Sequence, residues 1–210
     1  MLKHLPGHLN EGFIELESND ICDKSNKKRD EVDYMLFQGE KVSLRKMTVE
    51  DAPAYHKWQN DMKIAPLVNP FIDLYSLDEA EESLKRMLQP DNRKNYVIVD
   101  IKDKKPIGYT GLFNINHYHK NAECYIAICE AEYRGKGAGP EAMGLLMEYV
   151  FKEMNMHRLA LRVFAENEHA IGMYKRIGFQ VEGHLRETRF HNGSWQDSYI
   201  MSILQKGYLT

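Results

Sequence analysis

The sequence has few cysteines, no long apolar run and no excess of positive charge. Its three cysteines are Cys22, Cys124 and Cys129, and an odd count with two of them inside an apolar segment is typical of reduced thiols. No run approaches the ~18 apolar residues that span a bilayer, and the first residues lack the apolar core and cleavage site of a signal peptide. We therefore expect a cytoplasmic protein that is not embedded in a membrane.

The charge balance argues against nucleic acid and anionic membranes as partners. The chain has 28 Lys and Arg residues against 31 Asp and Glu residues, a formal net charge of −3, so no global basic field would attract polyanions. The nine histidines are scattered, and the closest pair, His117 and His119, has no cysteine or carboxylate at ligand spacing. We therefore expect no nucleic-acid partner and no metal site.

A length of 210 residues suits one domain with a full core. Residues 1–38 differ from the rest, because the stretch 20–33 is dense in charge and favours a solvated segment. A strand-like alternation of Val42 and Leu44 with polar residues follows. We predict a flexible N-terminal extension over 1–38 and a single domain over 39–210. Met35 is a plausible alternative start.

The domain alternates between strand and helix patterns. Ser76 and Glu79 form a capping-box signal, and Asn192-Gly193 signals a tight hairpin. Gly178 suits the left-handed position after a helix. The predicted strands are 41–45, 95–101, 106–116, 122–129, 158–164, 179–190 and 195–204, and the predicted helices lie near 49–60, 76–90, 140–154 and 167–178. This order indicates an α+β mixed sheet with helices on both faces.

A glycine-rich segment between a strand and a helix carries the strongest functional signal. The segment 134–139 reads RGKGAG. Its glycines let backbone N–H groups approach a phosphate, Arg134 and Lys136 add positive charge, and the helix dipole favours the same anion. It is not a G-x-x-x-x-G-K-[ST] loop, because Pro140 follows Gly139, and its spacing does not fit G-x-G-x-x-G.

The pattern R-x-x-G-x-G from Arg134 to Gly139 resembles the acyl-CoA pyrophosphate loop of the GNAT N-acetyltransferases. A second block, N-x-x-A-x-x-x-Y from Asn167 to Tyr174, is similar to that family's second cofactor block. The stretch 182–197 resembles the branch of ribosomal-protein alanine acetyltransferases and spermidine N-acetyltransferases. The resemblance covers about residues 40–206. It implies the GNAT fold: a mixed, mostly antiparallel sheet with helices on both faces and a splayed central strand pair.

The resemblance implies acetyl-CoA as co-substrate and assigns a role to individual residues. The hydroxyl of Tyr174 would protonate the departing thiolate, although a buried core tyrosine would give the same pattern. Asn167 would contact the pantetheine arm, cap its helix, or both. The implied cofactor-binding residues are Ala127, Ile128, Cys129, Arg134, Gly135, Lys136, Gly137, Ala138, Gly139 and Asn167.

Glu123 is the candidate general base, because relatives carry a glutamate near the start of the cofactor strand. Here one residue more than expected separates Glu123 from Arg134. Either the strand is bulged or Cys124 takes the position of the glutamate. A solvated strand-edge glutamate is the alternative, and His117 and His119 remain possible proton relays.

The acceptor is predicted to be the primary amine of a small molecule, such as a polyamine, amino sugar or amine antibiotic, that attacks the thioester directly. Five carboxylates could line its entrance, or could simply complement a helix dipole. They are Asp73, Asp78, Glu79, Glu81 and Glu82. The alternatives are a protein N-terminal acetyltransferase and a non-catalytic CoA-binding sensor. The strand-rich C-terminal half would also allow a homodimer.

Overall fold

The computed structural model describes residues 37–69, 71–89 and 91–209. The charged segment that we predicted to be flexible, together with Cys22, lies outside them. The described residues belong to one compact unit.

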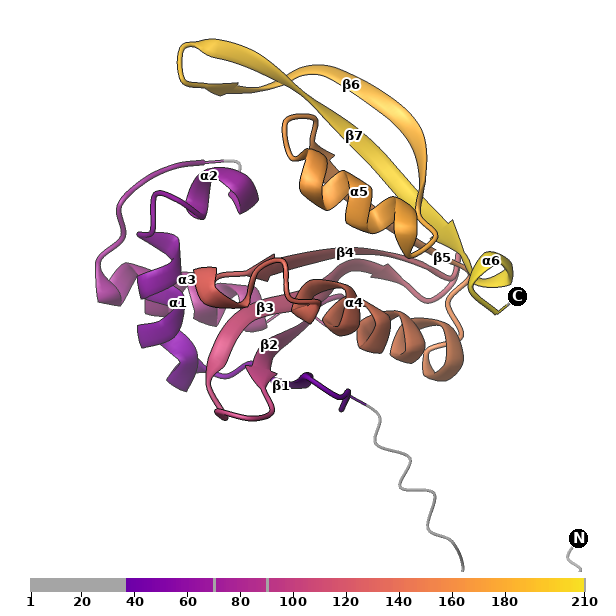
Figure 1. Cartoon of the computed structure of the whole chain (residues 1–210), viewed down its shortest axis with the longest axis horizontal. Helices are drawn as coiled ribbons and strands as arrows, with labels where there is room; N and C mark the ends of the chain where they lie inside the picture. The colour runs from indigo at the N-terminus through magenta and orange to yellow at the C-terminus, as the bar shows by residue number, and fades with distance from the viewer. Residues whose placement is uncertain (1–36, 70, 90, 210) are drawn as a thin grey trace, which may run out of the picture. The chain divides into compact units, whose positions relative to one another are not determined.

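A seven-stranded sheet in the order β1-β2-β3-β4-β5-β7-β6 forms the centre of this unit (Figure 1). Neighbouring strands are antiparallel except β4 and β5, which are parallel and pair only over Asn121–Glu123 and Arg158–Ala160. Past Glu123 the two strands part, so the splayed central pair is confirmed. The strands are β1 Val42–Lys46, β2 Lys94–Asp100, β3 Pro106–Asn116, β4 Asn121–Ile128, β5 Arg158–Phe164, β6 Gln180–His191 and β7 Ser194–Leu204.

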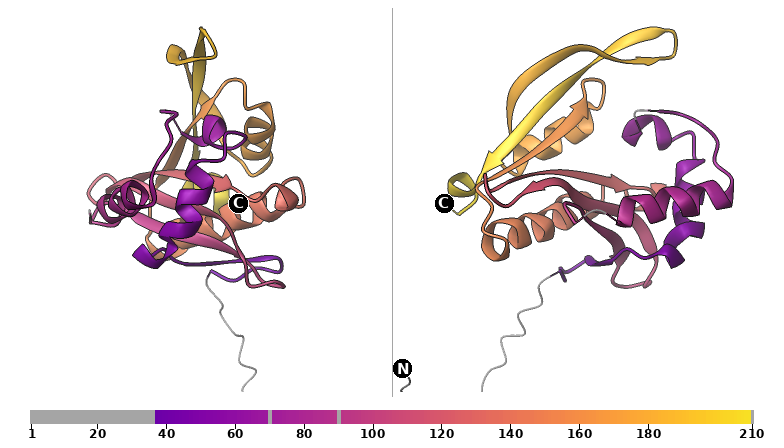
Figure 2. Two further views of the ribbon diagram at one scale, coloured as in Figure 1. Left: turned by 90° about the vertical axis from the view of Figure 1, so that its left-hand side faces the viewer. Right: turned by 180° about the vertical axis from the view of Figure 1, so that it is seen from behind.

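Helices cover both faces of the sheet, as predicted (Figure 2). The α-helices are α1 Ala52–Gln59, α2 Ala65–Val68, α3 Leu77–Leu88, α4 Ala138–Glu148, α5 Glu168–Arg176 and α6 Gln205–Leu209. The 3₁₀ turns η1 Val49–Asp51 and η2 Ala131–Tyr133 precede α1 and α4, and a π-helical turn, η3 Tyr149–Glu153, ends α4. In the described part of the chain no helix is long and apolar enough to cross a membrane.

Two hydrophobic cores lie on the two faces. On one face α4 and α5 pack against the sheet, and on the other α1 and α3 do so. Leu145 of α4 and Tyr149 of η3 are only partly buried, whereas Leu146 and Val150 are fully buried. The fully buried residues of α4 include Met143 and Met147. The helix begins at Ala138 rather than at residue 140.

Local sequence signals produce the expected turns and caps. The backbone N–H of Glu79 donates to Ser76 Oγ at 3.2 Å, and that of Ser76 donates to Glu79 Oε2 at 2.8 Å. Asn192 and Gly193 have φ of 49° and 77°, the left-handed pair that a tight hairpin requires. Gly178, with φ of 103°, follows the end of α5.

The folded domain includes Phe37 and Gln38, two residues that we had assigned to the extension. The ring centroid of Phe37 lies 5.2 Å from that of Tyr96 and 4.9 Å from that of Tyr149. The carbonyl of Phe37 accepts a hydrogen bond from Leu44 N at 2.8 Å. These contacts attach the chain before β1 to the core.

Candidate active site

The glycine-rich segment forms a left-handed loop at the start of α4. Gly135 and Gly137 have φ of 71° and 93°, and Gly137 is the N-cap residue. Among the described residues no side chain caps this helix. Pro140 has no N–H, and the N–H of Glu141 donates to Gly137 O at 3.2 Å. The N–H groups of Ala138 and Gly139 therefore remain available to an anion. A Cβ on Gly139 would lie 3.3 Å from Met173 Sδ, which shows how closely α4 and α5 approach each other at this loop.

Arg134 does not extend its side chain into the loop. Its Nε donates to the carbonyl of Ile128 at 2.9 Å, and its Nη2 donates to that of Cys129 at 3.3 Å. The guanidinium therefore braces the loop against the end of β4. It still brings positive charge to this region, while the exposed Lys136 stands in the loop itself.

The edge of β4 that faces β5 is open beyond Glu123. Ala127 and Ile128 pair with β3 on the other edge, through Tyr109 and Gly108, whereas β5 has already turned away. An extended pantetheine arm could lie along this edge as an added strand. Cys129 sits buried at its end, with its N–H donating to Ile107 O at 2.8 Å.

Two cysteines near this edge are protonated thiols. Burial raises the pKa of Cys124 and of Cys129, and the nearby charges do not reverse that shift. A thiol that holds its proton is a poor nucleophile. Attack by the acceptor amine on the thioester itself therefore fits this site better than an acetyl-cysteine intermediate.

Tyr174 and Cys124 lie together on the side of β4 that α5 covers. Tyr174 is 6% exposed, and its ring centroid lies 5.8 Å from that of Phe179. Burial, reinforced by Cys124, raises the pKa of Tyr174. The phenol is therefore a proton donor rather than a base. On the same helix, Asn167 Oδ1 accepts a hydrogen bond from Ala170 N at 3.1 Å, so Asn167 does cap α5.

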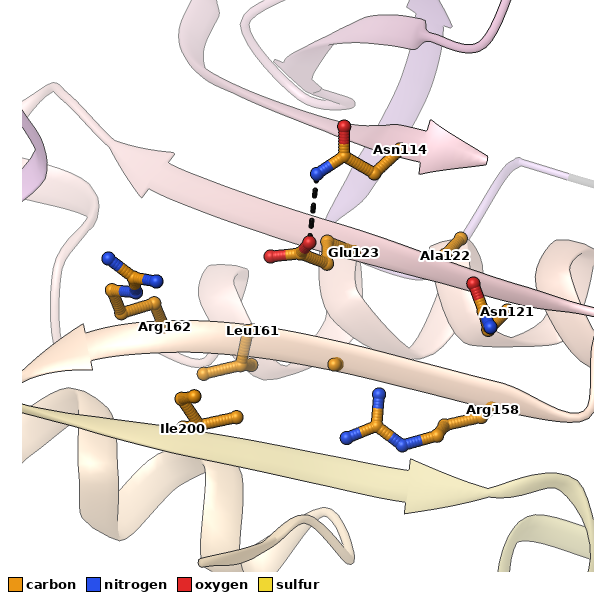
Figure 3. Close-up of a pocket in the computed structure, with 9 residues that line it drawn as sticks. Asn114, Asn121, Ala122, Glu123, Arg158, Leu161, Arg162 and Ile200 are labelled. Carbon is orange, nitrogen blue, oxygen red and sulfur yellow. Dashed lines mark hydrogen bonds between the residues drawn. The ribbon is translucent and has the colours of Figure 1, made fainter. Parts of the chain in front are cut away.

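Glu123 points to the opposite face of β4 and lines a cavity of about 300 Å³ (Figure 3). Asn114 Nδ2 donates to Glu123 Oε1 at 2.9 Å. The other oxygen, Oε2, has no hydrogen-bond partner among the residues that the structure describes. The cavity lies where β4 and β5 part, between residues of β3, β4, β5 and β7. Its lining consists of Asn114, Asn121, Ala122, Glu123, Arg158, Ala160, Leu161, Arg162 and Ile200.

The expected irregularity lies in the neighbouring strand rather than in β4 after Glu123. From Glu123 to Ile128 the register with β3 is unbroken. Between the pairs Phe113↔Glu123 and Asn116↔Asn121, β3 carries two residues opposite one residue of β4. The first of these, Asn114, has φ of 50°. The bulge in β3 brings Asn114 to Glu123, while Cys124 stays in the core and does not replace the glutamate.

The other acidic and histidine candidates serve local structure or lie exposed. Glu79 belongs to the capping box, and Glu81 and Glu82 pair with Lys85 and Arg86 one turn along α3. His117 and His119 lie in the exposed turn between β3 and β4. Among the described residues no group of three or more His, Cys, Asp and Glu side chains could hold a metal ion.

The sequence reading missed Asn114 and the two arginines of the cavity. Arg158 contacts Glu182 through a salt bridge between β5 and β6. Arg162 is exposed and has no ion-pair partner within the described ranges. Both arginines alternate along β5 with core leucines, and this alternation was the one signal that could have placed them on the cavity face.

A family model described as an acetyltransferase (GNAT) domain matches residues 41–180. The chain therefore belongs to the GNAT acetyltransferases. It is an acetyl-CoA-dependent acetyltransferase.

Two bacterial enzymes and one crystal structure show which acetyltransferases this chain is similar to. The spermidine N(1)-acetyltransferase of Vibrio cholerae is 34% identical over 169 residues, which cover 80% of this chain and 95% of that protein. The enzyme of the same name from Escherichia coli K12 is 32% identical over 170 residues, 80% of this chain and 88% of that one. A crystal structure of the Vibrio cholerae enzyme with CoA and spermine superposes with a TM-score of 0.74 at 33% identity, covering 81% and 99% of the two chains.

The loop at α4 fits the acetyl-CoA that this family uses. Left-handed glycines, free N–H groups and lysine charge suit the pyrophosphate, and the open edge of β4 suits the pantetheine. The bound co-substrate supplies an activated acetyl thioester, and the residues of the chain orient it and move protons.

Proposed function

We propose that the acceptor is a polyamine such as spermidine or spermine. The observation that carries this proposal is the carboxylate of Glu123, which presents one unpaired oxygen to the cavity at the splay of β4 and β5. The names of the similar bacterial enzymes support the same acceptor class. A carboxylate at this position can bind an ammonium and accept its proton.

In the chemical step, Glu123 and Tyr174 act from opposite faces of β4. Glu123 removes a proton from the ammonium, directly or through a water molecule. The free amine attacks the carbonyl carbon of the thioester, and a backbone N–H of β4 stabilises the oxyanion. The C–S bond then breaks as Tyr174 donates its proton to the CoA thiolate. The nitrogen of the new amide loses its second proton to solvent, and solvent returns a proton to Tyr174. Support comes from the raised pKa of Tyr174 and from the position of Glu123 in the cavity.

Arg162 favours a second candidate acceptor. Its unpaired guanidinium on the cavity wall repels the distal ammonium groups of a polyamine and attracts carbonyl or carboxylate oxygens. The amino terminus of a peptide has such oxygens close to its amine. Protein N-terminal acetylation is therefore the alternative to test beside polyamines.

The test is release of free thiol from acetyl-CoA against a panel of amines. The panel contains spermidine, spermine, aminoglycosides, amino sugars and an alanine-terminated peptide. Rapid turnover with spermidine or spermine would support the proposal. Turnover with the peptide alone would replace it by the second candidate, and turnover with an aminoglycoside or amino sugar alone would reject both.

We also propose a cytoplasmic homodimer. The buried thiols of Cys124 and Cys129 suit a reducing compartment. For the dimer, support comes from the edge strand β6, which among the described strands pairs with β7 alone, and from the exposed rings of Phe190 and Trp195. Light scattering of the wild-type protein and of Trp195→Lys tests whether the protein is a dimer. We expect a dimer that the substitution weakens.

A further inference from the structure

The cofactor loop receives positive charge from a residue outside its own segment. Arg134 donates hydrogen bonds from Nε and Nη2 to the carbonyls of Ile128 and Cys129. It therefore has fewer donors left for a phosphate. Lys136 is exposed in the loop. A ligand that carries several phosphate charges would be bound more firmly if another cation stood at the same place.

Lys41, the residue directly before β1, supplies a second cation beside this loop. Its Nζ donates to the carbonyl of Lys136 at 3.1 Å. The same Nζ lies 2.8 Å from the position that a Cβ on Gly137 would occupy. The ammonium therefore lies against the N-cap of α4, although Lys41 precedes Lys136 by 95 residues. An ammonium has three donors, so two remain for a ligand.

Glu141 holds the backbone of Lys41 in this position. It lies in the first turn of α4, where the helix dipole favours a carboxylate. Its carboxylate accepts hydrogen bonds from the N–H groups of Glu40 and Lys41, the latter at 3.1 and 3.2 Å. A Cβ on Gly39 would lie 2.1 Å from Glu141 Oε1. Residues 39–41 therefore form a strap across the start of α4.

We propose that Lys41 binds a phosphate group of acetyl-CoA and that Glu141 positions it. The inference rests on the acetyl-CoA dependence of the enzyme and adds a binding residue from the far end of the sheet to the cofactor loop. The ligand chemistry is a phosphate dianion or diester, which the pyrophosphate and the ribose 3′-phosphate of CoA both offer.

The first experiment compares Lys41→Met with Lys41→Arg. Removal of a charge-assisted hydrogen bond at an exposed site should raise the KM for acetyl-CoA about tenfold and leave kcat unchanged. The arginine variant should retain most of the affinity. Lys85→Met is the matched control, because Lys85 lies on the exposed side of α3 in a pair with Glu81. It should bind acetyl-CoA as the wild type does.

A phosphate-free substrate separates binding from a structural effect. S-acetylpantetheine carries the same thioester without phosphates, so Lys41→Met should leave its kcat/KM unchanged. An equal loss with both thioesters would overturn the proposal. Equilibrium binding of CoA and dephospho-CoA then identifies the group that Lys41 contacts. A variant that loses affinity for CoA alone identifies the 3′-phosphate, and a loss for both identifies the pyrophosphate.

Glu141→Gln tests the positioning role. It should weaken CoA binding in the wild-type background and add little to Lys41→Met, because the two residues act as one unit. Independent, additive losses would reject that role. These binding measurements need no acceptor amine, so their outcome does not depend on the polyamine assignment. Unchanged CoA affinity in Lys41→Met would reject the proposal whatever the acceptor proves to be.

Discussion

At the scale of single residues, burial decides what Tyr174 can do. Its hydroxyl is enclosed near Cys124, and burial raises its pKa above the ordinary value of a phenol. The proton therefore stays in place at every pH at which the enzyme is expected to work. Donation to a departing thiolate is the role that this protonation state allows.

Tyr174→Phe should lower kcat about a hundredfold and leave the KM for acetyl-CoA nearly unchanged, because only the proton donor is lost. Steady-state kinetics with the best acceptor measures this. Tyr118→Phe is the control, since Tyr118 is 89% exposed in the turn after β3. Unchanged turnover in Tyr174→Phe would remove the tyrosine from the mechanism.

Glu123→Gln should change the pH dependence of the reaction. An alkylamine with a pKa of about 10 is mostly protonated at neutral pH, so loss of the base should reduce kcat/KM about a hundredfold at pH 7. The deficit should shrink as the pH rises toward 10, where the free amine forms without help. Glu148→Gln, which breaks an ion pair with Lys152 one turn along, should keep the wild-type profile. A uniform deficit at all pH values would contradict the assignment of the base.

The chemical types of the site residues could be read from the sequence, but their partners could not. The glycine loop and the Asn167 cap follow from local pattern, because each acts within its own turn. Asn114 reaches Glu123 through a bulge, and Lys41 reaches the loop through the order of strands in the sheet. Contacts of this kind depend on register and topology, which residue spacing does not encode.

At the scale of elements, Gly178 lies in the turn that connects α5 to β6. Gly178→Ala should lower the free energy of unfolding by about 1–3 kcal/mol. The residue has φ of 103°, and an added Cβ would lie 2.9 Å from Ile203 Cδ1. Urea unfolding measures the loss.

The matched control for that substitution is Gly144→Ala. Gly144 lies inside α4, and a Cβ there would meet nothing within 4 Å. Alanine should therefore stabilise the protein by up to about 1 kcal/mol through helix propensity. If both variants lost the same stability, the strain assigned to Gly178 would be wrong.

The strands and long helices could be predicted from hydrophobic period and capping signals, and β3 and β5 have the predicted limits. The helices α2 and α6, of four and five residues, were missed because they are too short to show a period. The π-helical end of α4 was missed as well. Its residues Val150 and Phe151 are buried in the core, and local propensity does not signal a turn of this kind.

At the scale of the whole molecule, the position of Phe37 sets where the domain can begin. A chain that starts at Met35 should keep the stability and CoA affinity of the full-length protein. A chain that starts at Gly39 loses the contacts of Phe37 with Tyr96 and Tyr149 and its hydrogen bond with Leu44. It should lose about 3 kcal/mol of stability. Thermal unfolding of the three proteins measures this, and equal stability of the two shortened chains would refute the role of Phe37.

The order of strands also has a consequence for synthesis on the ribosome. Strands β1 to β4 are neighbours in the sheet in the same order as in the chain. Short turns join β2 to β3 and β3 to β4, while α1, α2 and α3 lie between β1 and β2, so β2, β3 and β4 need only short loop closures to assemble. The strand β5 joins β4 through just three parallel residue pairs, after α4 has crossed over. We expect the first half to collapse around α1 and α3 while β5, β6 and β7 are still being translated. A released chain that ends shortly after Ile128 should therefore already protect β2 and β3 from proteolysis.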